Sequence, residues 1–124
     1  MVEKKCILVV DDDPMNLKMA DFILKKASYE VILAASGAEC MDKLKENSID
    51  LVLLDIEMPQ ISGIETLEQI RAEGSFADLP VIFLSASGEE SDVQKANSLG
   101  AADYVKKPFL PPVLLECVEK ALNK

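Results

Sequence analysis

The sequence predicts an α/β fold of the doubly wound type, in which helices cover both faces of a five-stranded parallel sheet. Short apolar runs recur along the chain, and helical patterns separate them. Each β-then-α unit takes roughly 25 residues, close to the length of a βαβ repeat. Right-handed crossovers between parallel strands then place helices on both sides of the sheet.

Five apolar runs are expected to be strands. They cover 6–10 (CILVV), 31–35 (VILAA), 51–54 (LVLL), 81–84 (VIFL) and 103–105 (DYV). The first four are rich in Val, Ile and Leu and do not alternate with polar residues. This composition is typical of strands buried on both faces of a parallel sheet.

Helices are predicted after each strand, because apolar residues recur there at helical spacing. The stripes are Leu17, Ala20, Leu24 and Ala27; Ala38, Met41 and Leu44; Ile64, Leu67 and Ile70; Val93, Ala96 and Leu99; and Leu114, Val118, Ala121 and Leu122. The fourth stripe is the thinnest, so we expect the fourth helix to be the least firmly anchored.

Local residue types mark several helix ends. Asp13 precedes Pro14, which is the pattern of an N-cap followed by proline at the first helical position. Ser36 and Ser62 are expected to cap the second and third helices. Gly100 is expected to end the fourth helix.

Composition restricts the possible functions. At 124 residues the chain is expected to form a single domain spanning 1–124. Its three cysteines are widely spaced, which favours reduced thiols in a cytoplasmic protein. Histidine is absent, so Ser-His and Cys-His nucleophile pairs and most transition-metal sites are excluded. The net charge of −9 argues against nucleic-acid binding, and no apolar run is long enough to span a membrane.

Polar residues follow four predicted strands, at the edge of the sheet where open α/β folds bind ligands. Asp11 and Asp12 follow the first strand, Asp55 the third, Ser85 the fourth and Lys107 the fifth. Three converging carboxylates need a cation, because their repulsion otherwise raises at least one pKa. Oxygen ligands without His or Cys favour Mg²⁺. A lysine and a hydroxyl facing that metal suit a phosphoryl group, which an aspartate can accept as an acyl phosphate.

The sequence resembles receiver domains of two-component response regulators, which are related to the chemotaxis regulators. The matching segments are VVDDDP, LLDIEMPQISG, FLSA and GAADYVKKPF, and the similarity runs from about Lys5 to Leu122. Each segment alone is a weak signal, whereas their order and spacing together are specific. The resemblance implies a flavodoxin-like three-layer (βα)5 sandwich with the strand order 2-1-3-4-5.

The resemblance also implies roles for the residues at this edge. Asp55 is the expected phosphoacceptor. Asp12, Asp55 and the backbone carbonyl of Glu57 are the expected ligands of Mg²⁺, or of Mn²⁺ in its place. Asp11 is expected to act mostly through a metal-bound water. Ser85 is the expected switch hydroxyl.

Two further roles rest on the same resemblance. Tyr104 is the expected aromatic switch, which turns from solvent into the protein when Ser85 moves toward the phosphoryl group. Lys107 is expected to contact the phosphoryl group, and its bond to Pro108 is expected to be cis. The surface of the fourth helix, fifth strand and fifth helix then changes.

The implied activity is that of a signalling switch. A histidine kinase or a histidine phosphotransfer protein would donate a phosphoryl group from a phosphohistidine to Asp55. The switch would then regulate a downstream protein or an attached domain, neither of which the sequence identifies. No turnover of an external substrate is expected, and homodimer formation is left open.

Three alternatives remain. A small haloacid-dehalogenase-like phosphatase would use Asp11 and Asp13, although Pro14 and the lack of a cap domain weigh against it. A flavodoxin-like electron carrier would need a phosphate loop where DDDP would instead repel phosphate. A degenerate receiver that only docks is disfavoured, because every site residue is present.

Some individual residues have simpler interpretations. Asp11 and Asp12 could form an exposed turn, Asp55 could cap a strand, and Ser85 could compete with Ser87 as an N-cap. Tyr104 could be half-packed on the fifth helix.

For the remaining residues the simpler interpretation is preferred. Lys106 is interpreted as a solvated charge, and Phe109 as a core residue. Met15, Met19 and Met41 are interpreted as core filler.

Glu57 is an unusual neighbour for a phosphoacceptor. Its carboxylate could bind the metal, pair with Lys107 or repel the phosphoryl group. We therefore hypothesise that Glu57 alters the lifetime of the acyl phosphate.

Overall fold

The computed structural model describes residues 4–58, 62–85, 94–95, 97–107 and 110–123. The predictions for Ser87, Val93, Ala96, Pro108 and Phe109 fall outside these ranges.

The sheet has five parallel strands in the predicted order. The strands are β1 (Cys6–Val10), β2 (Glu30–Ala34), β3 (Leu51–Asp55), β4 (Val81–Ser85) and β5 (Asp103–Lys106). They are arranged β2-β1-β3-β4-β5, which confirms the fold class. Val10 pairs with Leu54, and Asp55 pairs with Leu84. The carboxyl ends of the three central strands therefore lie level with one another.

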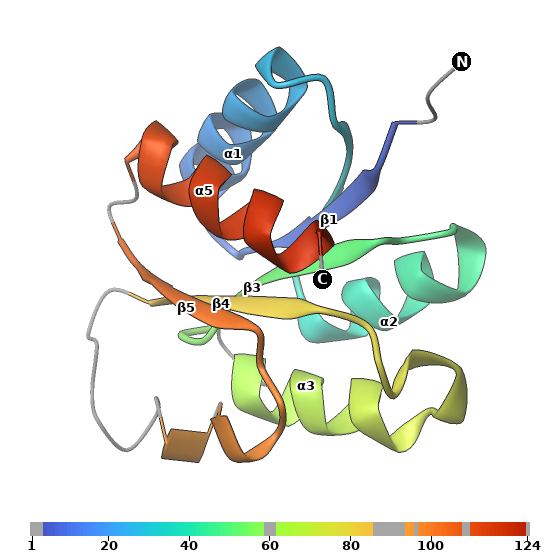
Figure 1. Ribbon diagram of the computed structural model, residues 1–124. Coiled ribbons are helices and arrows are strands. Elements are labelled where there is room, and N and C mark those ends of the chain that lie inside the picture. The colour runs from blue at the N-terminus through green and yellow to red at the C-terminus, as the bar shows by residue number, and fades with distance from the viewer. Residues whose placement is uncertain (1–3, 59–61, 86–93, 96, 108–109, 124) are drawn as a thin grey trace.

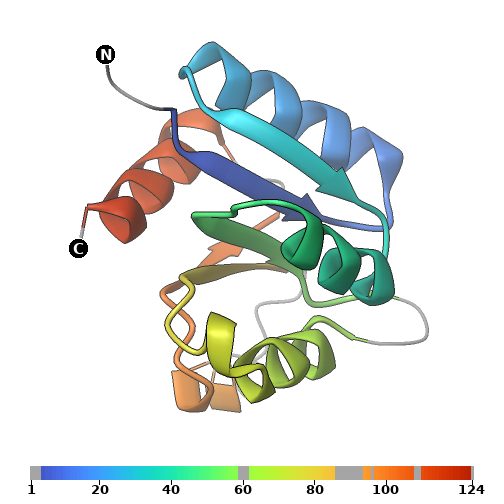
Figure 2. The same ribbon diagram turned by 90° about the vertical axis from the view of Figure 1, so that its right-hand side faces the viewer.

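Helices cover both faces of the sheet (Figures 1 and 2). Helices α1 (Pro14–Lys26) and α5 (Pro111–Leu122) lie on one face, and α2 (Gly37–Glu46) and α3 (Gly63–Ala72) lie on the other. A short 3-10 turn, η1 (Gly74–Phe76), follows α3. Between β4 and β5 the described residues 94–95 and 97–98 are helical.

Two apolar clusters fill the space between the sheet and its two helical layers. Alternate strand residues divide between them: Leu8 packs on the α2–α3 side, whereas its neighbour Ile7 packs on the α1–α5 side. Residues of β1, β3 and β4 are buried throughout, as the unbroken apolar runs predict. The same prediction is wrong for the run 31–35: β2 covers Glu30–Ala34, and only Ala34 is buried, because β2 lies at the edge of the sheet.

The predicted helical stripes are largely correct, with two corrections. Ala38 is exposed, and Cys40 takes its place in the core of α2. The buried residues of that helix are Gly37, Cys40 and Leu44, so Ala38 lies about 100° away from the buried face. Ala27 is exposed because α1 ends at Lys26 and Ala27 is its C-cap.

The predicted caps are confirmed. The Asp13 carboxylate accepts the Met15 amide at 3.0 Å, and Pro14 is the first residue of α1. Ser36 Oγ accepts the Glu39 amide at 3.1 Å. Ser62 and Glu65 form a reciprocal capping box at the start of α3. Gly100 has a φ of 78°, in the left-handed region where glycine avoids strain.

Gly63 fixes the distance between α3 and the end of β3. A Cβ at this position would overlap the Asp55 carbonyl oxygen and would lie 2.8 Å from Ile56 Cα. The Gly63 amide donates to the Ile56 carbonyl at 3.0 Å. Only glycine allows this approach, so the start of α3 supports the backbone of Asp55 directly.

Candidate functional site

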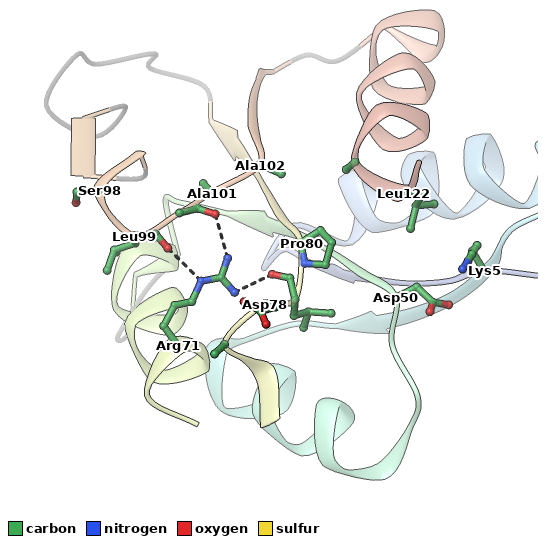
Figure 3. A pocket seen from close by; sticks show the side chains of 14 residues that line it. Lys5, Asp50, Arg71, Asp78, Pro80, Ser98, Leu99, Ala101, Ala102 and Leu122 are labelled. Atoms are coloured by element: carbon green, nitrogen blue, oxygen red, sulfur yellow. Dashed lines mark hydrogen bonds between the residues drawn. The ribbon is translucent and has the colours of Figure 1, made fainter. Parts of the chain in front are cut away.

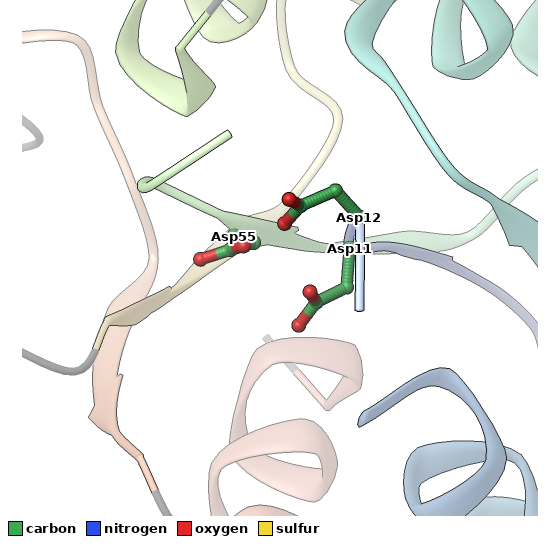
Figure 4. Close-up of side chains that lie close together, drawn as sticks. All are labelled: Asp11, Asp12 and Asp55. Atoms are coloured by element: carbon green, nitrogen blue, oxygen red, sulfur yellow. The ribbon is translucent and has the colours of Figure 1, made fainter. Parts of the chain in front are cut away.

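Three carboxylates converge at the carboxyl edge of the sheet (Figure 4). Asp11 and Asp12 directly follow β1, and Asp55 is the last residue of β3. Each offers an oxygen within 4.8 Å of the others. Asp11 and Asp55 are 0% and 1% exposed, whereas Asp12 is exposed. The interpretation of Asp11 and Asp12 as a simple exposed turn is therefore wrong for Asp11.

Lys107 lies between the two buried carboxylates. Its ammonium is 2.9 Å from Asp11 Oδ2 and 3.0 Å from Asp55 Oδ1. The Lys107 amide donates to the Ser85 carbonyl at 2.7 Å, which holds the residue beside the end of β4. Burial lowers the pKa of Lys107, but hydrogen bonds and attraction to the two carboxylates outweigh it and raise the pKa overall. Lys107 therefore stays protonated in this site.

One ammonium does not fully compensate two buried carboxylates. Burial raises the pKa of Asp55 to about 7, and repulsion from Asp11 adds to the effect. Lys107 and the Glu57 amide lower the pKa, but by less. The site thus favours an additional positive charge beside Asp55.

Backbone turns orient both buried carboxylates. Asp11 Oδ1 accepts the Asp13 amide at 2.9 Å, and Asp55 Oδ1 accepts the Glu57 amide at 3.2 Å. In each case the donor lies two residues further along the chain, so the side chain folds back over its own turn. The Lys107 ammonium contacts the other oxygen of Asp11, Oδ2, but contacts Asp55 through the same Oδ1 that accepts the Glu57 amide.

The donor set fits a hard divalent cation. Asp11 Oδ2 is buried and contacts the Lys107 ammonium at 2.9 Å, which leaves one of its lone pairs available. A buried anionic oxygen with spare acceptor capacity, beside two more carboxylates, is what Mg²⁺ requires. The predicted ligation by the Glu57 carbonyl remains a prediction.

Ser85 and Glu57 are joined at the rim of this site. Ser85 is the last residue of β4 and is fully buried, and its hydroxyl donates to Glu57 Oε1 at 3.1 Å. The Glu57 side chain is exposed. A surface carboxylate therefore reaches a buried hydroxyl next to Asp55, a contact that the sequence did not predict.

Tyr104 lies on β5, half-buried, and packs against the core of the α2–α3 side. The idea that it packs on α5 is wrong, because the alternation of β5 sends Val105 to that face. The phenol oxygen is buried and has no hydrogen-bond partner among the described residues. The predicted switch residue thus already has its phenol oxygen turned inward.

Met15 and Met19 are not core filler. They are 64% and 42% exposed, and Phe22, Leu110 and Val113 are exposed as well. We call these five residues the α1–α5 apolar surface. The sequence carried a signal for it, since residues 15, 19 and 22 recur at helical spacing on a face different from the buried stripe. Met41, in contrast, packs against the core as predicted.

A hollow of about 730 Å³ lies at the other edge of the sheet (Figure 3). Its lining includes Lys5, Asp50, Arg71 and Pro80, which precede strands or end helices. None of the candidate site residues lines it. We therefore do not assign the chemistry to this hollow.

Two observations bear on the alternatives. The Asp13 carboxylate caps α1 and is not among the three that converge, so the pair needed by a haloacid-dehalogenase-like phosphatase is not assembled. Within the described ranges, no helix is both long and apolar enough to cross a bilayer.

Comparison with known proteins completes this picture. The family model of the response regulator receiver domain matches residues 7–119. The rice two-component response regulator ORR26 is 44% identical over 104 residues, which are 82% of this chain and 17% of the rice protein. The polar-differentiation response regulator DivK of Brucella ovis is 29% identical over 119 residues, 96% of this chain and 97% of that protein.

Solved structures agree with the family model. The chemotaxis protein CheY4 of Vibrio cholerae has a TM-score of 0.93 at 28% identity, covering 97% of this chain and 100% of that one. A CheY-like receiver domain protein of Methanospirillum hungatei has a TM-score of 0.90 at 31% identity, covering 98% and 95%. Together with the acidic site, these similarities show that the chain belongs to the response regulator receiver domain family.

Proposed function

We propose that the chain is a phosphoacceptor switch in which Asp55 receives a phosphoryl group from a phosphohistidine. The observation that carries this proposal is the surroundings of Asp55: a buried carboxylate grouped with Asp11 and Asp12, with the Lys107 ammonium 3.0 Å away. A receiver domain implies a histidine kinase as partner in general. We extend this to direct transfer from a histidine kinase or a histidine phosphotransfer protein.

The transfer is a simple displacement. A carboxylate oxygen of Asp55 attacks phosphorus in line with the phosphorus–nitrogen bond of the donor. The new oxygen–phosphorus bond forms as the phosphorus–nitrogen bond breaks, and the electron pair of that bond stays on the donor's imidazole. Lys107 neutralises charge on the phosphoryl oxygens from a position that it already occupies.

Asp12, Asp55 and the Glu57 backbone carbonyl would hold the divalent cation, with Asp11 acting through a bound water. When bound, Mg²⁺, or Mn²⁺ in its place, would supply positive charge to the phosphoryl oxygens and to Asp55. Without it, burial raises the pKa of Asp55 to about 7, and Lys107 is the side chain that favours its ionised form.

The readout uses Ser85 and Tyr104. Ser85 is the register partner of Lys106 on the neighbouring strand, so a shift at the end of β4 would also displace the end of β5. Donation from Ser85 to a phosphoryl oxygen would stabilise the inward position of Tyr104. The surface formed by β5, α5 and the helical residues 94–95 and 97–98 would then present a changed shape to a downstream partner.

The α1–α5 apolar surface suits the docking of the phosphodonor. Its helix α1 starts immediately after Asp13, and Leu110 comes three residues after Lys107, so the surface borders the site. A hollow of about 360 Å³ lies among Met15, Met19 and Phe22, so the surface is concave there. A protein that delivers a phosphoryl group to Asp55 would cover this surface while doing so.

The proposal is tested with a small phosphodonor. Purified protein is incubated with acetyl phosphate and Mg²⁺, and its intact mass is measured. We expect one phosphoryl adduct on the parent, no adduct on Asp55→Asn, and no adduct when EDTA removes the metal. An unmodified parent would instead support a receiver that only docks.

The phosphatase alternative has its own control. Turnover of p-nitrophenyl phosphate that is lost in Asp11→Asn and kept in Asp55→Asn would favour it over the switch.

A further inference from the structure

We propose that Glu57 is a positioning residue that holds the Ser85 hydroxyl until Asp55 carries a phosphoryl group. The inference rests on the proposed phosphoacceptor role of Asp55. It assigns to the Glu57 carboxylate a specific action, which is competition with the phosphoryl oxygens for the Ser85 proton.

The hydrogen bond between Ser85 and Glu57 joins a buried hydroxyl to an exposed side chain. Ser85 is 0% exposed at the end of β4, and its hydroxyl donates to Glu57 Oε1 at 3.1 Å. The Glu57 backbone is fixed by donation from its amide to Asp55 Oδ1 at 3.2 Å. One residue thus contacts the acceptor carboxylate through its backbone and the switch hydroxyl through its side chain.

Competition follows from the chemistry of a hydroxyl. A serine hydroxyl carries one proton and therefore donates one strong hydrogen bond. Leu84 is the register partner of Asp55, so Ser85 lies one residue beyond the acceptor on the neighbouring strand. A phosphoryl oxygen on Asp55 would meet this hydroxyl, which must leave Glu57 before it can donate to the new acceptor.

The displaced contact is a charge-assisted one, which is stronger than a neutral hydrogen bond. Glu57 therefore stabilises the unmodified state through Ser85. A second effect, repulsion between the Glu57 carboxylate and the phosphoryl group, acts in the same direction but does not need the hydroxyl. The two effects separate in a double-mutant cycle.

The experiment compares four proteins: the parent, Glu57→Ala, Ser85→Ala and the double variant. Each is titrated with beryllium fluoride, a phosphoryl analogue, at saturating Mg²⁺, and binding is followed by ¹⁹F NMR. The Mg²⁺ affinity of each protein is measured separately, so that saturation is established. We expect Glu57→Ala to tighten analogue binding about tenfold more when Ser85 is present than when it is absent, as expected for one charge-assisted hydrogen bond.

Glu57→Gln serves as the conservative variant. It keeps an acceptor oxygen at the same position without the charge, so it should keep part of the coupling to Ser85 that Glu57→Ala loses. In metal-free protein the Ser85 amide resonance should shift more in Glu57→Ala than in Glu57→Gln.

The outcomes distinguish this inference from the proposed function. Equal effects of Glu57→Ala in both backgrounds would show that Glu57 acts by charge alone and would overturn the inference. A parent that binds no analogue and forms no acyl phosphate would overturn the proposed function, and the inference with it.

Discussion

The two edges of the sheet bury charges of opposite sign and surround them differently. At the carboxyl edge, two buried carboxylates share the single ammonium of Lys107, and the pKa of Asp55 is raised to about 7, chiefly by burial. At the amino edge, the Arg71 guanidinium donates four hydrogen bonds to backbone carbonyls. There Asp50 also accepts the Cys6 amide at 2.8 Å.

The acceptors of Arg71 are the carbonyls of Phe76, Leu79, Leu99 and Gly100. Arg71 thus joins the end of α3, the η1 turn and the segment before β5 (Figure 3). Burial lowers its pKa while Asp78 opposes the shift, and a guanidinium remains charged regardless. Four of its five N–H groups donate to carbonyls, whereas at the carboxyl edge two buried carboxylates share one ammonium.

This difference separates a structural site from a functional one. The amino edge has the larger hollow of the two described here, and the Arg71 guanidinium in its lining is held by backbone carbonyls. The carboxyl edge keeps an excess of negative charge, which a bound cation would offset. Four substitutions, given in order of expected effect, test this difference between the two edges.

Gly63→Ala should have the largest effect, a loss of about 3 kcal/mol in the free energy of unfolding. The added methyl group would overlap the Asp55 carbonyl and press on Ile56, so backbone at the carboxyl edge must move. Urea denaturation measures the change. Gly74→Ala is the matched control, because nothing lies within 4 Å of a Cβ at Gly74. Similar losses in both variants would contradict the close approach at Gly63.

Arg71→Ala should lower the free energy of unfolding by about 2 kcal/mol, because backbone carbonyls at the amino edge lose their donor. The loss should be the same with and without Mg²⁺, and acetyl phosphate should still modify the variant. Arg71→Lys should recover little, because an ammonium cannot reproduce the planar fork. A Mg²⁺-dependent loss would mean that the two edges are coupled.

Asp55→Asn should raise the free energy of unfolding at pH 8 by at least about 1 kcal/mol in metal-free buffer. The native pKa of about 7 exceeds the usual value of 3.8, so the native state resists ionisation and the unfolded state does not. The parent therefore loses stability as pH rises from about 4 to about 7, and the variant avoids this loss.

Thermal melts of parent and Asp55→Asn across this pH range test the sign. The advantage of the variant should be full above pH 7 and absent near pH 4. Mg²⁺ should shrink it by stabilising the parent. A variant that is less stable than the parent at pH 8 would show that Lys107 compensates Asp55 fully.

Tyr104→Phe should have the smallest effect, a gain of about 0.5–1 kcal/mol. The phenol oxygen is buried without a partner among the described residues, so its removal relieves a desolvation penalty. Urea denaturation of the unphosphorylated protein provides the measurement. A clear loss of stability would mean that the hydroxyl is satisfied in solution.

The sequence predicted the elements that depend on local pattern. Unbroken apolar runs identified the first four strands, and Asp13, Ser36 and Ser62 were recognised as caps because a cap needs only its own few residues. The convergence of Asp11, Asp12 and Asp55 was also predictable, since parallel strands end at one edge.

Contacts between distant segments were harder to predict. The α1–α5 apolar surface was missed because methionine suits both a core and a surface. The four acceptors of Arg71 are backbone carbonyls. Every residue has one, so the residue types do not show which carbonyls Arg71 contacts. The hydrogen bond from Ser85 to Glu57 depends on side-chain rotamers at two strand ends, which spacing does not determine.

The central claim is that Asp55, among the grouped carboxylates, carries the phosphoryl group. Borohydride reduces an aspartyl phosphate to homoserine, so treatment after incubation with acetyl phosphate and Mg²⁺ marks the modified residue for peptide mass spectrometry. We predict homoserine at position 55 and unmodified aspartate at positions 11, 12 and 13. Homoserine at any of those three positions, with Asp55 unchanged, would contradict the account.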